Sequence, residues 1–147
     1  MRKVHTDMFG ELEIDEKRSV HFKDGIPAFE QEHEFIILPY SEESPYYFMQ
    51  SLSRRDLAFM LTTPEPFFPD YSAEIDDATV KELGIDNPEN VCVYTVLTIP
   101  KERDYRDMTA NLLAPIVINT DNMAAKQIVM DGSSYNTKHR LFPEKKG

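Results

Sequence analysis

An uncharged, mostly apolar stretch at residues 109–119 constrains the fold of this chain more than any other feature. It reads Thr-Ala-Asn-Leu-Leu-Ala-Pro-Ile-Val-Ile-Asn, and no charged residue lies between Asp107 and Asp121, although 29% of all residues are charged. Pro115 joins an irregular polar segment to an apolar strand at residues 116–118. We predict that this strand is buried on both faces or that its open face meets another molecule.

Short apolar runs between turn residues fill much of the remaining chain, and each run predicts a strand. The run at residues 91–99 is apolar on both faces, so we expect it to be central in a sheet. The other predicted strands cover residues 2–6, 11–14, 19–22, 35–38, 46–52, 57–61 and 124–130.

One helical insertion is expected, at about residues 76–83. Asp76 is suited to cap its first turn, Val80 and Leu83 are placed to face inward, and Gly84 is a common helix terminator. With the strands, this predicts an all-β (β-rich) fold, a barrel or sandwich of antiparallel sheets in a single domain at residues 1–142. Residues 143–147 are expected to form a disordered tail.

Composition narrows the function classes. The 16 Lys and Arg against 26 Asp and Glu give a formal net charge of −10, which argues against direct nucleic-acid binding and favours a basic protein partner. A lone Cys92 fits a reducing compartment, and no run of residues predicts a signal peptide or a membrane span. We therefore expect a cytoplasmic protein without membrane contact.

Residues that typically carry catalysis are sparse. No phosphate-binding glycine loop, dinucleotide fingerprint or nucleophile elbow is present, and Cys92 lies within a predicted strand without a cationic neighbour. His21 and His33, with the acidic residues at 30–34, leave open a small hydrolase or a metal site. The simpler interpretation is a solvated acidic loop, so we expect no catalytic residue, metal or cofactor.

A proline-rich loop at residues 63–71 offers a better candidate for binding. Three prolines in six positions exclude a helix and a central strand there, and they hold Phe68, Asp70 and Tyr71 close together. Rigid aromatic and carboxylate groups are typical of interface anchors, because they lose little side-chain entropy on docking. Packing in the core is the alternative role for these aromatic side chains.

Several motifs, in order along residues 9–142, make the chain resemble the FliW family of flagellar assembly factors. In two places the chain departs from the family pattern: Ala28 stands where glycine is more common, and Arg54-Arg55 occupies a turn that is often acidic or proline-containing. The motifs that carry the resemblance are Phe9-Gly10-Glu11, Gly25-Ile26-Pro27-Ala28-Phe29-Glu30, Leu57-Ala58-Phe59, Phe67-Phe68-Pro69-Asp70-Tyr71, the stretch 109–119, and Tyr135-Asn136-Thr137-Lys138-His139.

The resemblance implies a non-enzymatic, cytoplasmic protein that binds two partners in turn. One is flagellin, and the other is CsrA, an RNA-binding repressor of flagellin translation that FliW-like proteins antagonise allosterically when they are free of flagellin. Asn111 and Leu112 join Phe68, Asp70 and Tyr71 as predicted contact residues, although Asn111 is also suited to satisfy a local turn. A flagellin chaperone without a regulatory role, or a hydrolase using His21 or His33, is the alternative.

Overall fold

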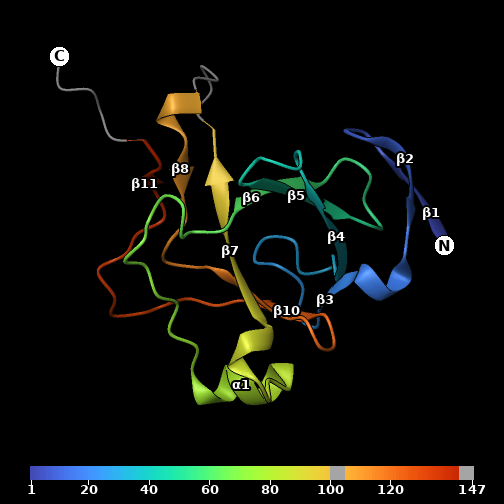
Figure 1. Cartoon of the computed structure of the whole chain (residues 1–147). Helices are drawn as coiled ribbons and strands as arrows, with labels where there is room; N and C mark the ends of the chain where they lie inside the picture. The colour runs from blue at the N-terminus through green and yellow to red at the C-terminus, as the bar shows by residue number, and fades with distance from the viewer. Residues whose placement is uncertain (100–104, 143–147) are drawn as a thin grey trace.

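In the computed structural model, which describes residues 1–99 and 105–142, the chain folds into a closed β-barrel (Figure 1). Within these residues, seven strands form the ring in the order β3-β4-β5-β6-β7-β9-β10, and β10 returns to β3. The ring strands are β3 (Val20–Phe22), β4 (Glu34–Pro39), β5 (Tyr46–Ser51), β6 (Ala58–Thr62), β7 (Val91–Thr98), β9 (Ile116–Asn119) and β10 (Ala124–Gln127).

Most neighbours in the ring are antiparallel, as the sequence predicts. The exception is the β3–β10 pair, which is parallel and joins Ala124 to His21 and Ala125 to Phe22. Strand β7 contacts three strands, since it pairs with β6, β8 (Thr109–Ala110) and β9. The expectation that residues 91–99 form a central strand is therefore confirmed.

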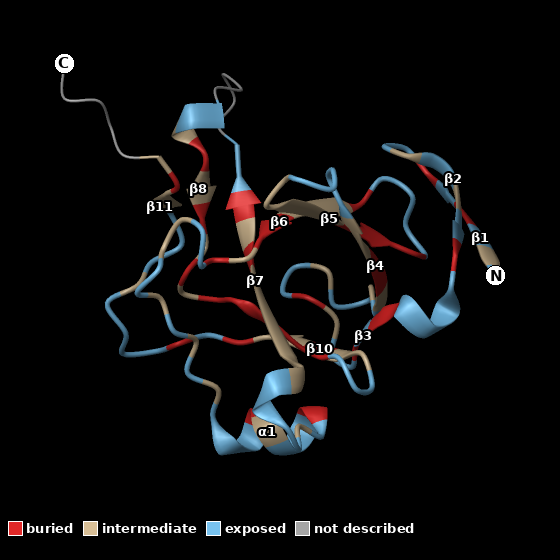
Figure 2. Ribbon diagram, viewed as in Figure 1, coloured by how far each residue is buried: buried red, intermediate tan, exposed pale blue. Residues whose placement is uncertain are grey.

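The barrel core is made by side chains that alternate along the strands. Phe22 and Phe35 pack edge to face with ring centroids 5.5 Å apart, and Met49, Leu61 and Ile116 are fully buried beside them. Figure 2 shows buried stretches in red on several strands of the ring. Burial of such side chains contributes about 1.5–3 kcal/mol each to folding.

Three smaller units surround the barrel. The hairpin of β1 (Arg2–Thr6) and β2 (Gly10–Ile14) packs Val4 and Ile14 on Ile36 of β4 and lies beside that strand in Figure 1. Strand β11 (His139–Arg140) pairs with β8 and extends the sheet beyond β7. The 3-10 turns η1, η2 and η3 span Glu16–Arg18, Pro88–Asn90 and Tyr105–Asp107.

The helix α1 (Asp77–Leu83) begins and ends where the sequence predicts. The Asp76 side chain accepts a hydrogen bond from the Thr79 N–H at 2.8 Å, and Gly84 ends the helix in the left-handed conformation with φ 65°. Thr79 and Leu83 are buried, whereas Val80, which we expected to face inward, is only half-buried. The helix covers only the β9–β10 end of the barrel, so it packs along one narrow face. Val80 lies at the side of that face and stays partly exposed.

One strand is shorter than predicted. Residues 124–130 were expected to form a strand, but β10 ends at Gln127. The N–H groups of Ile128 and Met130 still donate to the carbonyls of Pro115 and Leu113, at 3.0 and 2.9 Å, so the chain stays alongside an irregular neighbour without a regular ladder. The predicted tail at 143–147 lies outside the described residues. Among the residues that are described, no helix has the length and apolar character needed to cross a membrane.

Candidate functional site

The proline loop forms one wall of a surface hollow of about 320 Å³, which we call the aromatic hollow. Its other walls come from the segment after β8 and from the chain that leads into β11. Because these segments are far apart in sequence, the hollow exists only in the folded barrel. The lining residues are Phe67, Phe68, Pro69, Asp70, Tyr71, Leu112, Tyr135 and His139.

Backbone hydrogen bonds hold the proline loop in a compact turn. The N–H groups of Phe67 and Phe68 both donate to the Pro64 carbonyl, at 3.1 and 2.8 Å, and the Tyr71 N–H donates to the Phe68 carbonyl at 2.9 Å. The prolines remove donors that would otherwise need partners. The loop therefore presents its aromatic side chains with little freedom left to lose on binding.

Tyr71 ties this loop to the segment after β8. Its hydroxyl donates a 2.7 Å hydrogen bond to the Leu112 carbonyl. Burial, and then the nearby Tyr135, raise the pKa of Tyr71 to about 12, so the hydroxyl stays protonated as a donor at neutral pH. Tyr71 is therefore a fixed part of the wall.

Edge-to-face ring contacts complete the far wall. The ring of Tyr135 lies 4.8 Å from that of Tyr71 and 5.9 Å from His139, and Phe68 lies 6.1 Å from His139. The His139 Nε2 accepts a 2.9 Å hydrogen bond from the Asn136 N–H, which places the ring proton of the neutral imidazole on Nδ1. These contacts fix the shape of the hollow from both sides.

The structure brings four of the five predicted contact residues together. Phe68, Asp70, Tyr71 and Leu112 all line the aromatic hollow. Asp70 is exposed and makes no ion pair with any residue in the described ranges, so its carboxylate faces solvent. Leu112 has only 2% of its side chain exposed and forms the floor, so it shapes the hollow from below and does not present a free surface.

Asn111 is the exception. Its Oδ1 accepts a 3.0 Å hydrogen bond from the Ala114 N–H, and the residue does not line the hollow. This is the local turn that the sequence left open as the alternative role. The geometry thus favours a structural role for Asn111 ahead of partner contact.

Tyr135 and His139 were not predicted as contact residues. They reach the hollow because the Leu113 N–H donates to the Asn136 carbonyl at 3.2 Å, which draws the distant segment against the proline loop. The signal available in the sequence was the motif at 135–139, one of those that carry the family resemblance. Its position next to residues 67–71 requires knowledge of the fold.

The apolar strand that follows Pro115 is not an open surface. All four residues of β9 are buried, which confirms the expectation of burial on both faces. Asn119, at the end of the strand, is 1% exposed, and its Nδ2 donates to the carbonyls of Leu83 and Gly84 at 2.9 and 3.2 Å. The stretch 109–119 therefore joins the barrel wall to the end of α1.

Comparison with known proteins decides the family. The family model described as FliW protein matches residues 3–141. The chain belongs to the FliW family. It is 43% identical over 143 residues to the flagellar assembly factor FliW of Geobacillus sp. (strain WCH70), covering 97% of each chain, and 44% identical over 141 residues to that of Bacillus subtilis (strain 168), covering 96% of this chain and 97% of the relative.

A solved structure extends the likeness to three dimensions. The crystal structure of a flagellar assembly factor FliW superposes with a TM-score of 0.90 at 41% identity, covering 98% of this chain and 99% of the other. The closed β-barrel with its single described α-helix is therefore the fold of the FliW family. The predicted β-rich fold is confirmed.

The first departure from the FliW pattern has a visible structural consequence. Ala28 has φ 73°, in the left-handed region, and it sits in a turn where the Ile26 and Phe29 backbones bond to each other. Pro27 occupies the second position of this turn and Ala28 the third, where a type II turn requires a positive φ. Alanine thus holds here a left-handed backbone conformation that glycine adopts at lower cost.

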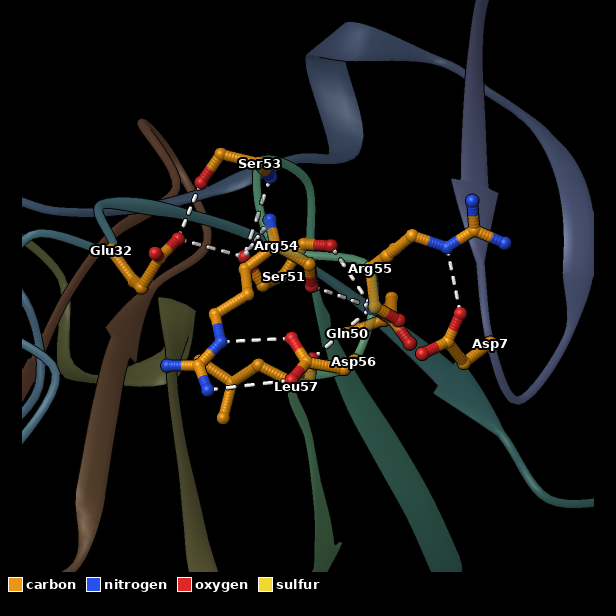
Figure 3. Close-up of polar contacts among 9 residues, drawn as sticks. All are labelled: Asp7, Glu32, Gln50, Ser51, Ser53, Arg54, Arg55, Asp56 and Leu57. Carbon is orange, nitrogen blue, oxygen red and sulfur yellow. Dashed lines mark hydrogen bonds and ion pairs between the residues drawn. The ribbon is translucent and has the colours of Figure 1, made fainter.

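The second departure, at the β5–β6 turn, does not create a basic patch. Arg54 Nε donates to Asp56 at 2.8 Å and Arg55 Nε donates to Asp7 at 2.7 Å (Figure 3). Glu32 adds a third carboxylate, which accepts from the hydroxyls of the turn serines. Each arginine is thus balanced locally, and the turn also fastens the β1–β2 hairpin to the barrel.

The hydrolase alternative depends on the surroundings of His21 and His33. His21 Nε2 lies 3.4 Å from the Ser19 hydroxyl, and its Nδ1 lies 3.7 Å from Glu34, an order of groups that resembles a catalytic triad. Ser19, however, is 4% exposed and its hydroxyl already donates to the Glu16 carbonyl at 2.7 Å. A nucleophile needs both access and a proton held by the base, so this geometry does not favour hydrolysis.

His33 and metal binding gain no support either. The His33 Nδ1 lies 2.9 Å from the Phe22 carbonyl, a bond that anchors the start of β4. Within the described ranges, no group of three or more His, Cys, Asp or Glu side chains is arranged to hold a metal ion.

Proposed function

We propose that this FliW family member is a non-enzymatic cytoplasmic regulator that binds flagellin and, when free of it, binds CsrA. Membership of the family supports a role in flagellar assembly, since the relatives of this chain are named flagellar assembly factors. The aromatic hollow, with its preset walls and open Asp70 carboxylate, is the surface that we assign to partner contact. The hollow provides a surface for protein recognition, whereas the geometry at His21 and His33 does not favour hydrolysis.

Mass action then accounts for switching between the partners. If flagellin and CsrA exclude each other on this protein, flagellin lowers the apparent affinity for CsrA. The factor is one plus the ratio of the free flagellin concentration to its dissociation constant. To antagonise RNA binding from a separate surface of CsrA, the protein must bind RNA-free CsrA more tightly than RNA-bound CsrA. The coupling is reciprocal, so RNA must weaken this complex by the same factor.

Charge supports the choice of CsrA. The formal net charge of −10 repels RNA and attracts a basic RNA-binding protein. Association with CsrA should therefore slow as salt rises. An association rate that is unchanged by salt would remove this electrostatic contribution.

The decisive assay measures CsrA binding to flagellin mRNA with this protein added, in the presence and absence of flagellin. We expect the protein to weaken RNA binding and flagellin to restore it. Flagellin binding without any effect on CsrA would identify a chaperone with no regulatory role. Failure to bind either protein at micromolar concentration would refute the proposal.

A charge reversal tests the assigned surface. Asp70→Lys should leave the fold intact, because Asp70 is exposed and makes no ion pair within the described residues. The variant should lower the affinity for at least one partner by about tenfold or more, because it places like charges in contact. Asp131→Lys makes the same charge change at another exposed position outside the hollow. Equal effects of the two variants on partner binding would show that only net charge matters.

A further inference from the structure

One end of the barrel interior is not filled by side chains. A cavity of about 610 Å³ opens there between η1, the β4–β5 turn and the strands of the ring, and we call it the barrel cup. Its volume falls in the range of pockets that hold small ligands. Its apolar walls are formed by Val20, Ile37, Tyr47, Cys92, Tyr94 and Ile118.

The cup lies where several side chains of the barrel core stay only partly buried. Phe22, Phe35 and Phe59 pack against one another and close one end. At the other end the inward positions of β7 carry Cys92 and Tyr94, which remain half-buried although they belong to the same core cluster. Figure 2 shows the first half of β7 in the intermediate colour. A small barrel that is left unfilled in this way can enclose one ligand.

The two tyrosines that line the cup make no side-chain hydrogen bond to the described residues. The rings of Tyr47 and Tyr94 meet edge to face at 5.3 Å, and neither hydroxyl is hydrogen-bonded within the described residues. Burial is the main reason that the pKa of Tyr94 rises to about 12, so this hydroxyl remains a donor at neutral pH. The cup therefore offers hydrogen-bond donors on an apolar wall, a combination that selects ligands with an apolar body and an acceptor group.

Cations outnumber anions among the residues that line the cup, although the molecule as a whole is acidic. Lys17 and Arg18 of η1 line the cup, and neither makes an ion pair in the part of the chain that the structure describes. Glu42, on the β4–β5 turn, is the one carboxylate among the residues lining the cup. The lining therefore holds two cations and one anion on a protein of net charge −10, and this excess of cations is the feature that suits an anionic ligand.

From these observations we infer that the barrel cup binds an amphipathic carboxylate, a small molecule with a medium-length apolar chain and an anionic head. The chain lies against Ile37 and Cys92 inside the barrel, and the head meets Lys17 and Arg18 at the mouth. The site is separate from the aromatic hollow, with which it shares no lining residue. It does not depend on which protein partners bind there.

The test is calorimetric titration of the folded full-length chain with hexanoate, octanoate and decanoate. We expect one molecule bound per chain, with affinity rising about fourfold for each added methylene until the cup is full. Decanol, which lacks the charge, should bind more weakly, and decyltrimethylammonium, which reverses it, should bind weakest. An affinity for decyltrimethylammonium equal to that for decanoate would overturn the assignment of the mouth.

Cys92 gives an independent readout, because it is the only cysteine in the chain and it lines the cup. Decanoate should slow the reaction of its thiol with a thiol-specific reagent in proportion to the occupancy measured by calorimetry. Saturating decanoate that left this rate unchanged would place the ligand elsewhere and refute the proposal. This measurement needs no variant.

Two variants and a control locate the parts of the site. Ile37→Trp fills the cup and should abolish binding, while Arg18→Gln should weaken decanoate by up to about fivefold without affecting decanol. Lys138→Gln removes the same charge at an exposed position outside the cup and should change neither. If no free carboxylate binds at millimolar concentration while the Cys92 thiol stays reactive, the proposal is wrong and an apolar side chain of a protein partner becomes the better occupant.

Discussion

Ala28→Gly should stabilise this protein, although it removes a methyl group and loosens the unfolded chain. Alanine in the left-handed region costs about 1–2 kcal/mol relative to glycine. Ala28 occupies that region with φ 73°. Glycine costs about 0.4–1 kcal/mol through greater freedom of the unfolded state. The difference predicts a gain of about 0.8 kcal/mol, within a range of roughly 0–1.6 kcal/mol, in the free energy of unfolding.

Two further variants separate backbone strain from steric overlap. Gly132 has φ 80° and open space around the position of a Cβ, so Gly132→Ala should cost the strain less the gain from a stiffer unfolded chain, a net loss of about 0.8 kcal/mol. Gly25 has φ 71°, and a Cβ there would lie 2.5 Å from the backbone oxygen of Glu30. Gly25→Ala should therefore cost the strain plus about 1–3 kcal/mol of overpacking.

Urea denaturation of the three variants gives the free energies directly, and thermal unfolding should follow with shifts of about 2–4 °C per kcal/mol. A loss of stability in Ala28→Gly would show that residue 28 does not hold the left-handed geometry. Equal losses in Gly25→Ala and Gly132→Ala would mean that the close approach to Glu30 is absent. Either result would refute the account of this turn.

Three other predictions concern groups that hold the fold and the hollow. Asn119→Ala removes the two hydrogen bonds that a buried side chain donates to the carbonyls at the end of α1, and it should lower the free energy of unfolding by about 2–3 kcal/mol, read from urea denaturation. Tyr71→Phe leaves the Leu112 carbonyl without its donor and should cost about 1 kcal/mol in the same assay, with weaker binding of the hollow's partner. The hydrogen bonds from Thr79 hold the pKa of Asp76 below 3.8, so this cap contributes stability that is present above that pH and is lost as pH falls through the folded value. The difference in melting temperature between the native chain and Asp76→Asn should therefore shrink between neutral pH and about pH 3.

Local signals predict much of this fold because the relevant interactions are short in sequence. The cap at Asp76 and the stop at Gly84 depend on residues within one helical turn, and both are found where expected. Strands β5 and β6 form the hairpin that two apolar runs around a charged turn predict. The length of the strand after residue 124 was overestimated, since Ile128 and Met130 continue the apolar pattern while their neighbour becomes irregular at Pro115.

Closure of the barrel was beyond these signals. Apolar alternation states that a strand is half or fully buried, but the same pattern serves a sandwich and a barrel. The ring closes through the parallel pair of β3 and β10, whose residues are about a hundred positions apart, and through β7 with β9. Nothing in either strand alone specifies such a partner.

The aromatic hollow shows the same limit at the level of a site. Phe68, Asp70 and Tyr71 were recognisable because prolines make their loop rigid, a property of nine neighbouring residues. Tyr135 and His139 complete the hollow only because β11 pairs with β8 and brings the distant segment alongside. Leu112 was predicted as a contact residue because it precedes the apolar strand, but it is only 2% exposed and so presents almost no surface to a partner. Rigidity can thus be predicted from local sequence, whereas the direction in which a side chain faces depends on strand pairing. Asp70 is the better residue with which to test partner binding, because the structure shows it exposed while Leu112 is buried.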